Sequence, residues 1–278
     1  MPANVLAIAN VDRALALLEL LADRPEGASL GALAEAAEVP KSAVHRLLSS
    51  LALRGYVLQD LLTQDYRLSL KLGALGFRLL DAGAMPDVAQ EVLDRLARDS
   101  GEYCRLAVVE DRALYWTARA QGATQGLRYE PPMGREVMLH ATASGKAWLA
   151  TLPEDDALRI VVQRGFSGRP GMGSRASQTL DDFRRHLRDA RRRGYALAVD
   201  EAEPGIVAVA AAFGLSPAAD APTVGTVSVA GPGVRFDAKH AEALAPRVRE
   251  AALELAALWP TRRRQGSTSL RQRLSDAA

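Results

Sequence analysis

The sequence has one cysteine, four histidines and only 5% aromatic residues, and it has no apolar run near the ~20 residues that a membrane-spanning helix needs. Cys104 alone can form neither an internal disulfide nor a cysteine-rich zinc site, and the histidines lack the paired spacing of metal ligands. No charged start followed by an apolar run marks a signal peptide at the N-terminus. We therefore expect a cytoplasmic protein without a bound metal or other cofactor.

The chain is long enough for two domains with separate hydrophobic cores. It has 278 residues, of which 48% are hydrophobic, and a net charge of only +2. Residues 1–84 carry eight Lys or Arg against nine Asp or Glu, so charge alone does not mark this part as a binder of nucleic acid. The composition predicts one small domain and one larger domain.

The most informative segment is 39–55. A helix beginning near Pro40 would place one apolar stripe at i, i+3, i+4 and i+7, because Val44, Leu47, Leu48 and Leu51 have that spacing. The opposite side would carry donors and acceptors that meet water or base edges. These residues are Lys41, Ser42, His45, Arg46 and Ser49.

The neighbouring segments predict a winged helix-turn-helix. Residues 29–37 read as a short helix with Ser29 as its N-cap, joined to the next helix by a tight turn. Residues 11–22 form an amphipathic helix that can cover both, and 56–59 and 65–68 alternate like the strands of a wing. Such a module would contact DNA, although small dimerisation or adaptor modules give the same pattern. As phosphate contacts we expect Lys41, Arg54 and Arg67.

Residues 68–81 form a connector helix that is apolar around most of its circumference, with Leu68, Leu72, Leu75 and Leu79 along one line. This line needs a partner, either in the helix's own domains or in a second copy of the chain. The remaining pattern predicts an α+β domain whose antiparallel sheet carries helices on its faces. Its helices are expected at 87–100, 143–150, 180–193 and 239–258, and its strands at 105–109, 113–117, 195–199, 206–213 and 223–230.

Features that would suggest catalysis are weak. Ser144-Gly-Lys146 is similar to the end of a phosphate-binding loop, but His140 stands where that motif needs glycine, and Ala147 replaces the Mg²⁺-binding hydroxyl residue. Asp200, Glu201 and Glu203 have no histidine or nucleophile near them in the sequence. We expect no catalytic residues and no enzyme. An enzyme acting on a small acid in the C-terminal domain is the alternative.

Three separated motifs together resemble the IclR family of transcriptional regulators, over about residues 10–258. They are Pro40-Lys-Ser-Ala-Val-His-Arg-Leu-Leu48; Gly134 followed by His140-Ala-Thr-Ala-Ser-Gly-Lys-Ala-Trp-Leu-Ala150; and Arg193-Gly-Tyr-Ala196 with Gly205 and Ser228-Val-Ala-Gly-Pro232.

The resemblance implies a sequence-specific DNA-binding regulator, repressor or activator, that acts as a homodimer or tetramer. A small-molecule effector would bind a C-terminal GAF-like domain and shift the placement of the two winged domains through the linker helix. The expected parts are a winged helix-turn-helix at 1–70, a linker and dimerisation helix at 71–84, an effector-binding domain at 85–260 and a disordered basic tail at 261–278.

The resemblance also implies an effector pocket, and this chain has alanine at Ala198, Ala208 and Ala230 where family members often carry polar residues. An apolar wall with one carboxylate-binding end favours an aromatic or otherwise apolar organic acid over a small keto acid. Alternatively, these alanines fill core space and the pocket lies elsewhere. The pocket residues that we expect are Leu127, Tyr129, Met133, Ala143, Ser144, Asp200, Ile206, Ala208, Ser228 and Ala230.

Overall fold

The computed structural model describes residues 9–81, 86–133, 136–166, 171–215 and 222–259. The chain divides into two compact units, Met1–Ala82 and Gly83–Ala278, each with its own buried apolar side chains. None of the described helices is long and apolar enough to cross a membrane. The tail predicted at 261–278 lies outside the described residues.

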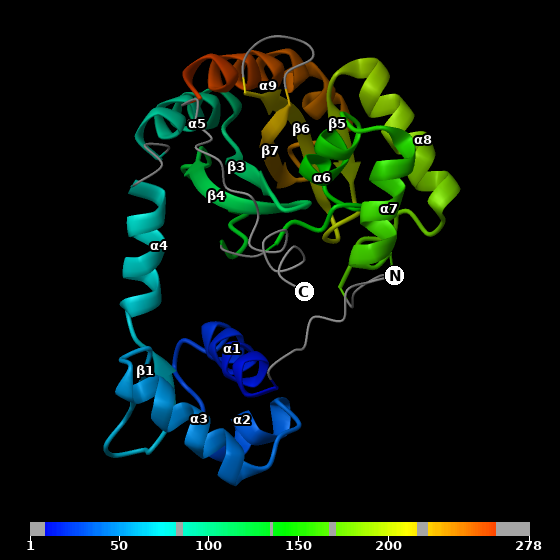
Figure 1. Cartoon of the computed structure of the whole chain (residues 1–278). Coiled ribbons are helices and arrows are strands. Elements are labelled where there is room, and N and C mark those ends of the chain that lie inside the picture. The colour runs from blue at the N-terminus through cyan, green and yellow to red at the C-terminus, as the bar shows by residue number, and fades with distance from the viewer. Residues whose placement is uncertain (1–8, 82–85, 134–135, 167–170, 216–221, 260–278) are drawn as a thin grey trace. The chain divides into compact units, whose positions relative to one another are not determined.

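The first unit is a winged helix-turn-helix, as predicted (Figure 1, blue to cyan). Ser29 caps the second helix, because its hydroxyl accepts a hydrogen bond from the backbone N–H of Ala32 at 3.2 Å. Leu17, Leu33 and Leu48 from three different helices are buried together in its core. Its elements are α1 (Ala9–Ala22), α2 (Leu30–Ala36), α3 (Lys41–Leu53), β1 (Val57–Gln59), β2 (Tyr66–Leu68) and α4 (Lys71–Asp81).

The connector helix begins later than the leucine spacing predicts. Leu68 belongs to β2, where it pairs with Val57 across the wing, and α4 starts at Lys71. The Ser69 hydroxyl accepts a hydrogen bond from the backbone N–H of Lys71 at 3.1 Å and donates one to the carbonyl of Gly55. Ser69 therefore marks the end of β2 and caps the first turn of α4. The line of leucines on α4 lacks its first predicted member, Leu68.

The second unit is a five-stranded antiparallel sheet with helices on both faces, which confirms the predicted α+β class (Figure 1). The strand order is β4-β3-β7-β6-β5. Its strands are β3 (Tyr103–Glu110), β4 (Ala113–Gln121), β5 (Ala196–Val199), β6 (Ile206–Gly214) and β7 (Thr223–Pro232). Its helices are α5 (Pro86–Ser100), α6 (Ala143–Leu149), α7 (Glu154–Arg164), α8 (Leu180–Arg193) and α9 (Ala238–Leu258).

The two faces of this sheet bury different sets of side chains, as the alternation along β6 shows. Val207 and Val209 pack in the cluster formed with α5 and α9, whereas Ala208 and Ala210 belong to the cluster formed with α6, α7 and α8. Valine fills the first interface. Alanine on the other face leaves room for α6 to approach the sheet closely.

Helix α7 was not predicted, and β3 and β4 extend beyond the predicted strands. The signals for α7 are present in the sequence, since Pro153 precedes three acidic residues in the first turn and Arg164 lies in the last turn. Its buried face is formed by Ala157, Ile160 and Val161.

Helix α6 depends on Gly145 for its position. A Cβ at this residue would lie 2.3 Å from the carbonyl oxygen of Leu139. We expect Gly145→Ala to lower the free energy of unfolding by about 1–3 kcal/mol or more, because the backbone at residue 145 must move away from the backbone of Leu139. Urea denaturation would measure the loss. Gly73→Ala on α4, where a Cβ meets nothing within 4 Å, is the control and should not destabilise the chain; equal stability of the two variants would contradict the expectation.

Candidate functional site

The face of α3 that was expected to read DNA is open to solvent. The five side chains predicted for this face are exposed, while Val44 and Leu48 on the opposite side are fully buried in the core. Arg46 forms no ion pair with any described residue, so its guanidinium is available to an external acceptor. The exposed residues are Lys41, Ser42, His45, Arg46 and Ser49.

Local hydrogen bonds restrict one of these side chains. The Ser49 hydroxyl donates to the carbonyl of His45 at 2.8 Å, so its proton is used within the helix while its oxygen can still accept. Arg54 follows the end of α3 and Arg67 lies on β2, and both are exposed. Arg67 is the only basic residue of the wing at 57–68.

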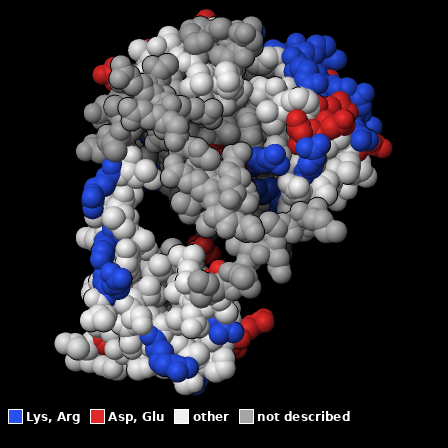
Figure 2. All heavy atoms as spheres, in the orientation of Figure 1, with Lys and Arg blue, Asp and Glu red and all other residues white. Residues whose placement is uncertain are grey.

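A second basic surface lies on α8 (Figure 2). Three of its six arginines have acidic partners one turn away, for example Arg185 with Asp182 and Arg192 with Asp189, and Arg193 pairs with Glu242. Such exposed pairs contribute little to stability, but they cancel the charge that would attract a polyanion. Among the described residues, neither Arg46 on α3 nor Arg67 in the wing forms an ion pair, although the charge of Arg67 acts on the nearby Asp60 carboxyl; they form the better candidate surface for DNA.

A small cavity in the second unit brings together seven of the ten residues predicted for the effector pocket. It lies between α6 and the strands β5, β6 and β7, and its volume of about 30 Å³ has room for about one water molecule. The predicted residues that line it are Tyr129, Ala143, Ser144, Ile206, Ala208, Ser228 and Ala230.

The other three predicted residues do not line this cavity. Leu127 is 63% exposed, and Met133 packs against the core beside α6 and α7. Asp200 shapes a turn instead: with φ of 54° it accepts hydrogen bonds from the Ser174 hydroxyl and the Gly205 N–H. These bonds hold the pKa of the Asp200 carboxyl below its usual value. Sequence position alone did not reveal this turn.

Arg105 is the main cavity residue that sequence reasoning missed. Its side chain comes from β3 and is 8% exposed, and its guanidinium carbon lies 3.7 Å from the centre of the Trp116 ring. Within the described part of the chain, the Nε–H has no hydrogen-bond acceptor, and no carboxylate forms an ion pair with the group. Burial lowers the pKa of this guanidinium. A charged residue inside an otherwise apolar strand was the available signal.

Tyr129 and the exposed Glu203 form a hydrogen-bonded pair in the lining of the cavity. The Tyr129 hydroxyl donates a hydrogen bond to Glu203 Oε1 at 2.8 Å, and both side chains line the cavity with Arg105. Burial raises the pKa of the Tyr129 hydroxyl, so it stays a donor at neutral pH. Ser144, which also lines the cavity, is 1% exposed, and its hydroxyl has no hydrogen-bond partner among the residues that the structure describes.

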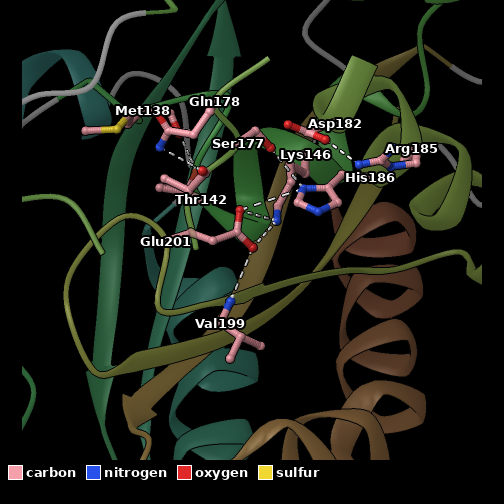
Figure 3. A network of polar contacts seen from close by, with 11 residues as sticks. Met138, Thr142, Lys146, Ser177, Gln178, Asp182, Arg185, His186, Val199 and Glu201 are labelled. Carbon is pink, nitrogen blue, oxygen red and sulfur yellow. Dashed lines mark hydrogen bonds and ion pairs between the residues drawn. The ribbon is translucent and has the colours of Figure 1, made fainter. Parts of the chain in front are cut away.

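A polar network surrounds Lys146 and Glu201, which are both buried and lie close in the sequence to the cavity residues Ser144 and Ala202 (Figure 3). The Lys146 ammonium donates to both carboxylate oxygens of Glu201, at 2.7 and 2.8 Å, and burial lowers the pKa of Lys146 while Glu201 opposes this shift. His186 Nδ1 lies 3.8 Å from Glu201 Oε2 and 3.2 Å from the Ser177 hydroxyl. The network ties α6 and α8 to the loop after β5.

A wider groove of about 760 Å³ is lined by none of the predicted residues. Its floor includes Trp148, Ile160 and Phe213, and arginines stand at its edge. It is therefore one place for the effector under the alternative in which the pocket lies elsewhere; a hollow of about 300 Å³ beside Lys146 and Glu201 is another. The small cavity differs from the groove by holding buried polar groups without partners, Arg105 Nε and Ser144 Oγ, which a ligand could satisfy.

These features define a winged helix-turn-helix protein with a separate domain that contains a polar cavity. A family model described as the IclR helix-turn-helix domain matches residues 10–61, and one described as the bacterial transcriptional regulator IclR C-terminal domain matches residues 78–257. The chain belongs to the IclR family and is a DNA-binding transcriptional regulator.

Individual relatives agree with this assignment. HTH-type transcriptional regulator BhcR of Paracoccus denitrificans is 31% identical over 250 residues, which cover 88% of this chain and 85% of that protein. The acetate operon repressor of Salmonella typhimurium is 28% identical over 205 residues, 73% of each chain.

Two solved structures share the fold. The IclR regulator from Alicyclobacillus acidocaldarius has a TM-score of 0.73 at 23% identity, covering 91% of this chain and 98% of that one. An IclR homolog from Microbacterium hydrocarbonoxydans, complexed with 4-hydroxybenzoate, has a TM-score of 0.69 at 22% identity, covering 89% of this chain and 97% of that one.

The network around His186 predicts a pH dependence of stability. Burial, followed by the charge of Lys146, lowers the pKa of His186 against the opposing carboxylates of Glu201, Asp189 and Asp182. A lowered pKa in the folded state gives stability that is present above the unfolded pKa and is lost as the pH falls through the folded value.

From about pH 7 to about pH 5 we therefore expect wild type to lose more unfolding free energy than His186→Gln does. Urea titrations at several pH values would measure this difference. His45→Gln, at an exposed site on α3, should follow wild type. Parallel curves for wild type and His186→Gln would contradict the expectation.

Proposed function

We propose that the exposed face of α3 reads the operator. The observation that supports this role is the set of side chains on that face, which form no ion pair with any described residue and lie on the second helix of the helix-turn-helix. Arg46 and the polar residues beside it would contact base edges. Lys41, Arg54 and Arg67 would contact phosphates.

The protein is proposed to bind DNA as a dimer joined through α4. Leu75 and Leu79 are 38% and 64% exposed, and Leu72 is half-buried, so the predicted apolar line has no cover within the described chain. A second copy of the same helix would bury it. Two winged domains then meet two half-sites about one helical turn apart.

The effector is proposed to be a small organic acid with an apolar, aromatic body, held in the cavity beside α6. Alanine at Ala198, Ala208 and Ala230 gives apolar walls, and Arg105 supplies a buried cation. The fold relative complexed with 4-hydroxybenzoate supports this class. The described lining residues include no histidine or cysteine, which supports binding without turnover. The cytoplasm, where DNA is available, is the proposed location.

Arg46→Ala is expected to weaken specific DNA binding by about 1–3 kcal/mol, because a contact to a base edge is lost while the exposed side chain does not stabilise the fold. Fluorescence anisotropy with DNA from the gene's own upstream region and a scrambled duplex, at several salt concentrations, would measure this. Arg13→Ala, at an exposed position on α1, removes the same charge elsewhere and should bind like wild type. Equal affinity of wild type for both duplexes would overturn the proposal of specific reading.

The Leu75→Glu, Leu79→Glu double variant should be monomeric, because four carboxylates would meet where two helices pack. Analytical ultracentrifugation would show the change in mass, and operator affinity should fall with it. Ala74→Glu, on another side of α4, is the control and should stay dimeric. A double variant that remains a dimer would exclude α4 as the interface.

A further inference from the structure

The cavity is too small for the ligand class that its lining favours. About 30 Å³ admits roughly one water molecule, whereas sites for organic ligands hold ~300 Å³ or more. The cavity must therefore open on binding. The pair formed by Tyr129 and Glu203 determines how this happens.

Glu203 is the cavity-lining side chain best able to leave. The residue is exposed, so its carboxylate can turn into water without a large desolvation change. Its hydrogen bond to the Tyr129 hydroxyl nevertheless places a carboxylate at the edge of a cavity that contains Arg105. Coulombic attraction links Glu203 to Arg105 as well.

The loop that carries Glu203 is held at both ends by short contacts to charged groups, whereas in its middle the Glu203 carbonyl accepts a longer hydrogen bond from the Ile206 N–H at 3.4 Å. Glu201 is held by Lys146 at 2.7 and 2.8 Å, and the Gly205 N–H donates to the Asp200 carboxylate at 2.7 Å. Between these anchors, Ala202 and Glu203 line the cavity. A change at this point can therefore move residues 202–204 without unfolding the loop.

The interior of the cavity already complements a carboxylate. In the described ranges of the chain, Arg105 Nε–H has no acceptor and the hydroxyl of Ser144, a residue that is 1% exposed, has no partner. Buried donors of this kind are normally satisfied, so the unliganded cavity holds unused hydrogen-bonding capacity. Trp116 and Tyr129 supply flat apolar surface next to the cation.

We propose that Glu203 is an internal substitute for the effector's carboxylate. In the unliganded protein it holds Tyr129 and closes the cavity beside Arg105. An incoming organic acid takes its place, binds Arg105 and Ser144, and releases residues 202–204. This inference rests on the proposed effector site. It adds that Arg105 anchors the effector, that Glu203 competes with it, and that residues 202–204 respond to binding.

Removal of the competitor should strengthen acid binding. Calorimetry with the full-length protein and benzoate is expected to show binding to Glu203→Ala about tenfold tighter than to wild type, because one charged hydrogen bond no longer competes. Glu130→Ala is the matched control: its carboxylate pairs with Arg119 and Arg128 outside the cavity, and benzoate affinity should not change. Acetate should raise the melting temperature of Glu203→Ala more than chloride at equal ionic strength.

The role of Arg105 is tested without altering the fold by exchanging benzoate for uncharged benzamide. Glu203→Ala should bind benzamide at least about tenfold more weakly than benzoate. In the Arg105→Met, Glu203→Ala variant, with folding checked by circular dichroism, both the preference for benzoate and the acetate effect should vanish.

Several results would overturn the inference: equal benzoate affinity in Glu203→Ala and wild type, no preference over benzamide, or no benzoate binding to Glu203→Ala at millimolar concentration. Operator binding of the wild-type protein tests the proposed reading of DNA by α3 independently of the inference about Glu203. Benzoate binding with equal affinity in wild type and Glu203→Ala removes the inference alone, whereas no benzoate binding to either protein also removes the proposed effector class. Absence of specific DNA binding removes the proposed reading of DNA by α3 whatever the calorimetry shows.

Discussion

The ion pair between Lys146 and Glu201 is the contact on which the architecture around the cavity depends. Each charge costs several kcal/mol to remove from water, and mutual pairing offsets this cost only while the geometry holds. The two residues are 2% and 5% exposed, so α6 and the loop after β5 cannot separate without leaving a bare buried charge. The pair therefore fixes Ser144 on one wall of the cavity relative to residues 202–208 on the other.

Much of the fold follows from local sequence signals. The period of the apolar residues on α3, the Ser29 cap and the alternation in the wing predicted the first unit correctly. The order of strands and helices predicted an antiparallel sheet. These signals act over a few residues, so one sequence is sufficient to read them. Helix α7 has start and stop signals of the same kind, at Pro153 and Arg164, and was predictable from them.

The site was less predictable because its key contacts join distant parts of the chain. Arg105 became a cavity residue only when β3 and β7 were paired, which brought it opposite Ser228. Lys146 in the Ser-Gly-Lys motif is an ion-pair partner of Glu201, which is 55 residues away in the sequence. Asp200 was expected in the pocket, yet a left-handed backbone conformation turned its carboxylate to Ser174. Strand order, burial and backbone conformation decide such roles, and no short motif encodes them.

The small number of positive charges on the wing affects how long the protein stays bound to DNA of unrelated sequence. A subunit that neutralises few phosphates releases few condensed counterions, and counterion release provides almost all of the affinity for unrelated sequence. With Arg67 as the only cation of the wing, the affinity of a subunit for unrelated sequence would depend mainly on Lys41 and Arg54, and few counterions would be released. A regulator with few such contacts would exchange readily between DNA and solution, where changes in effector concentration reach it directly.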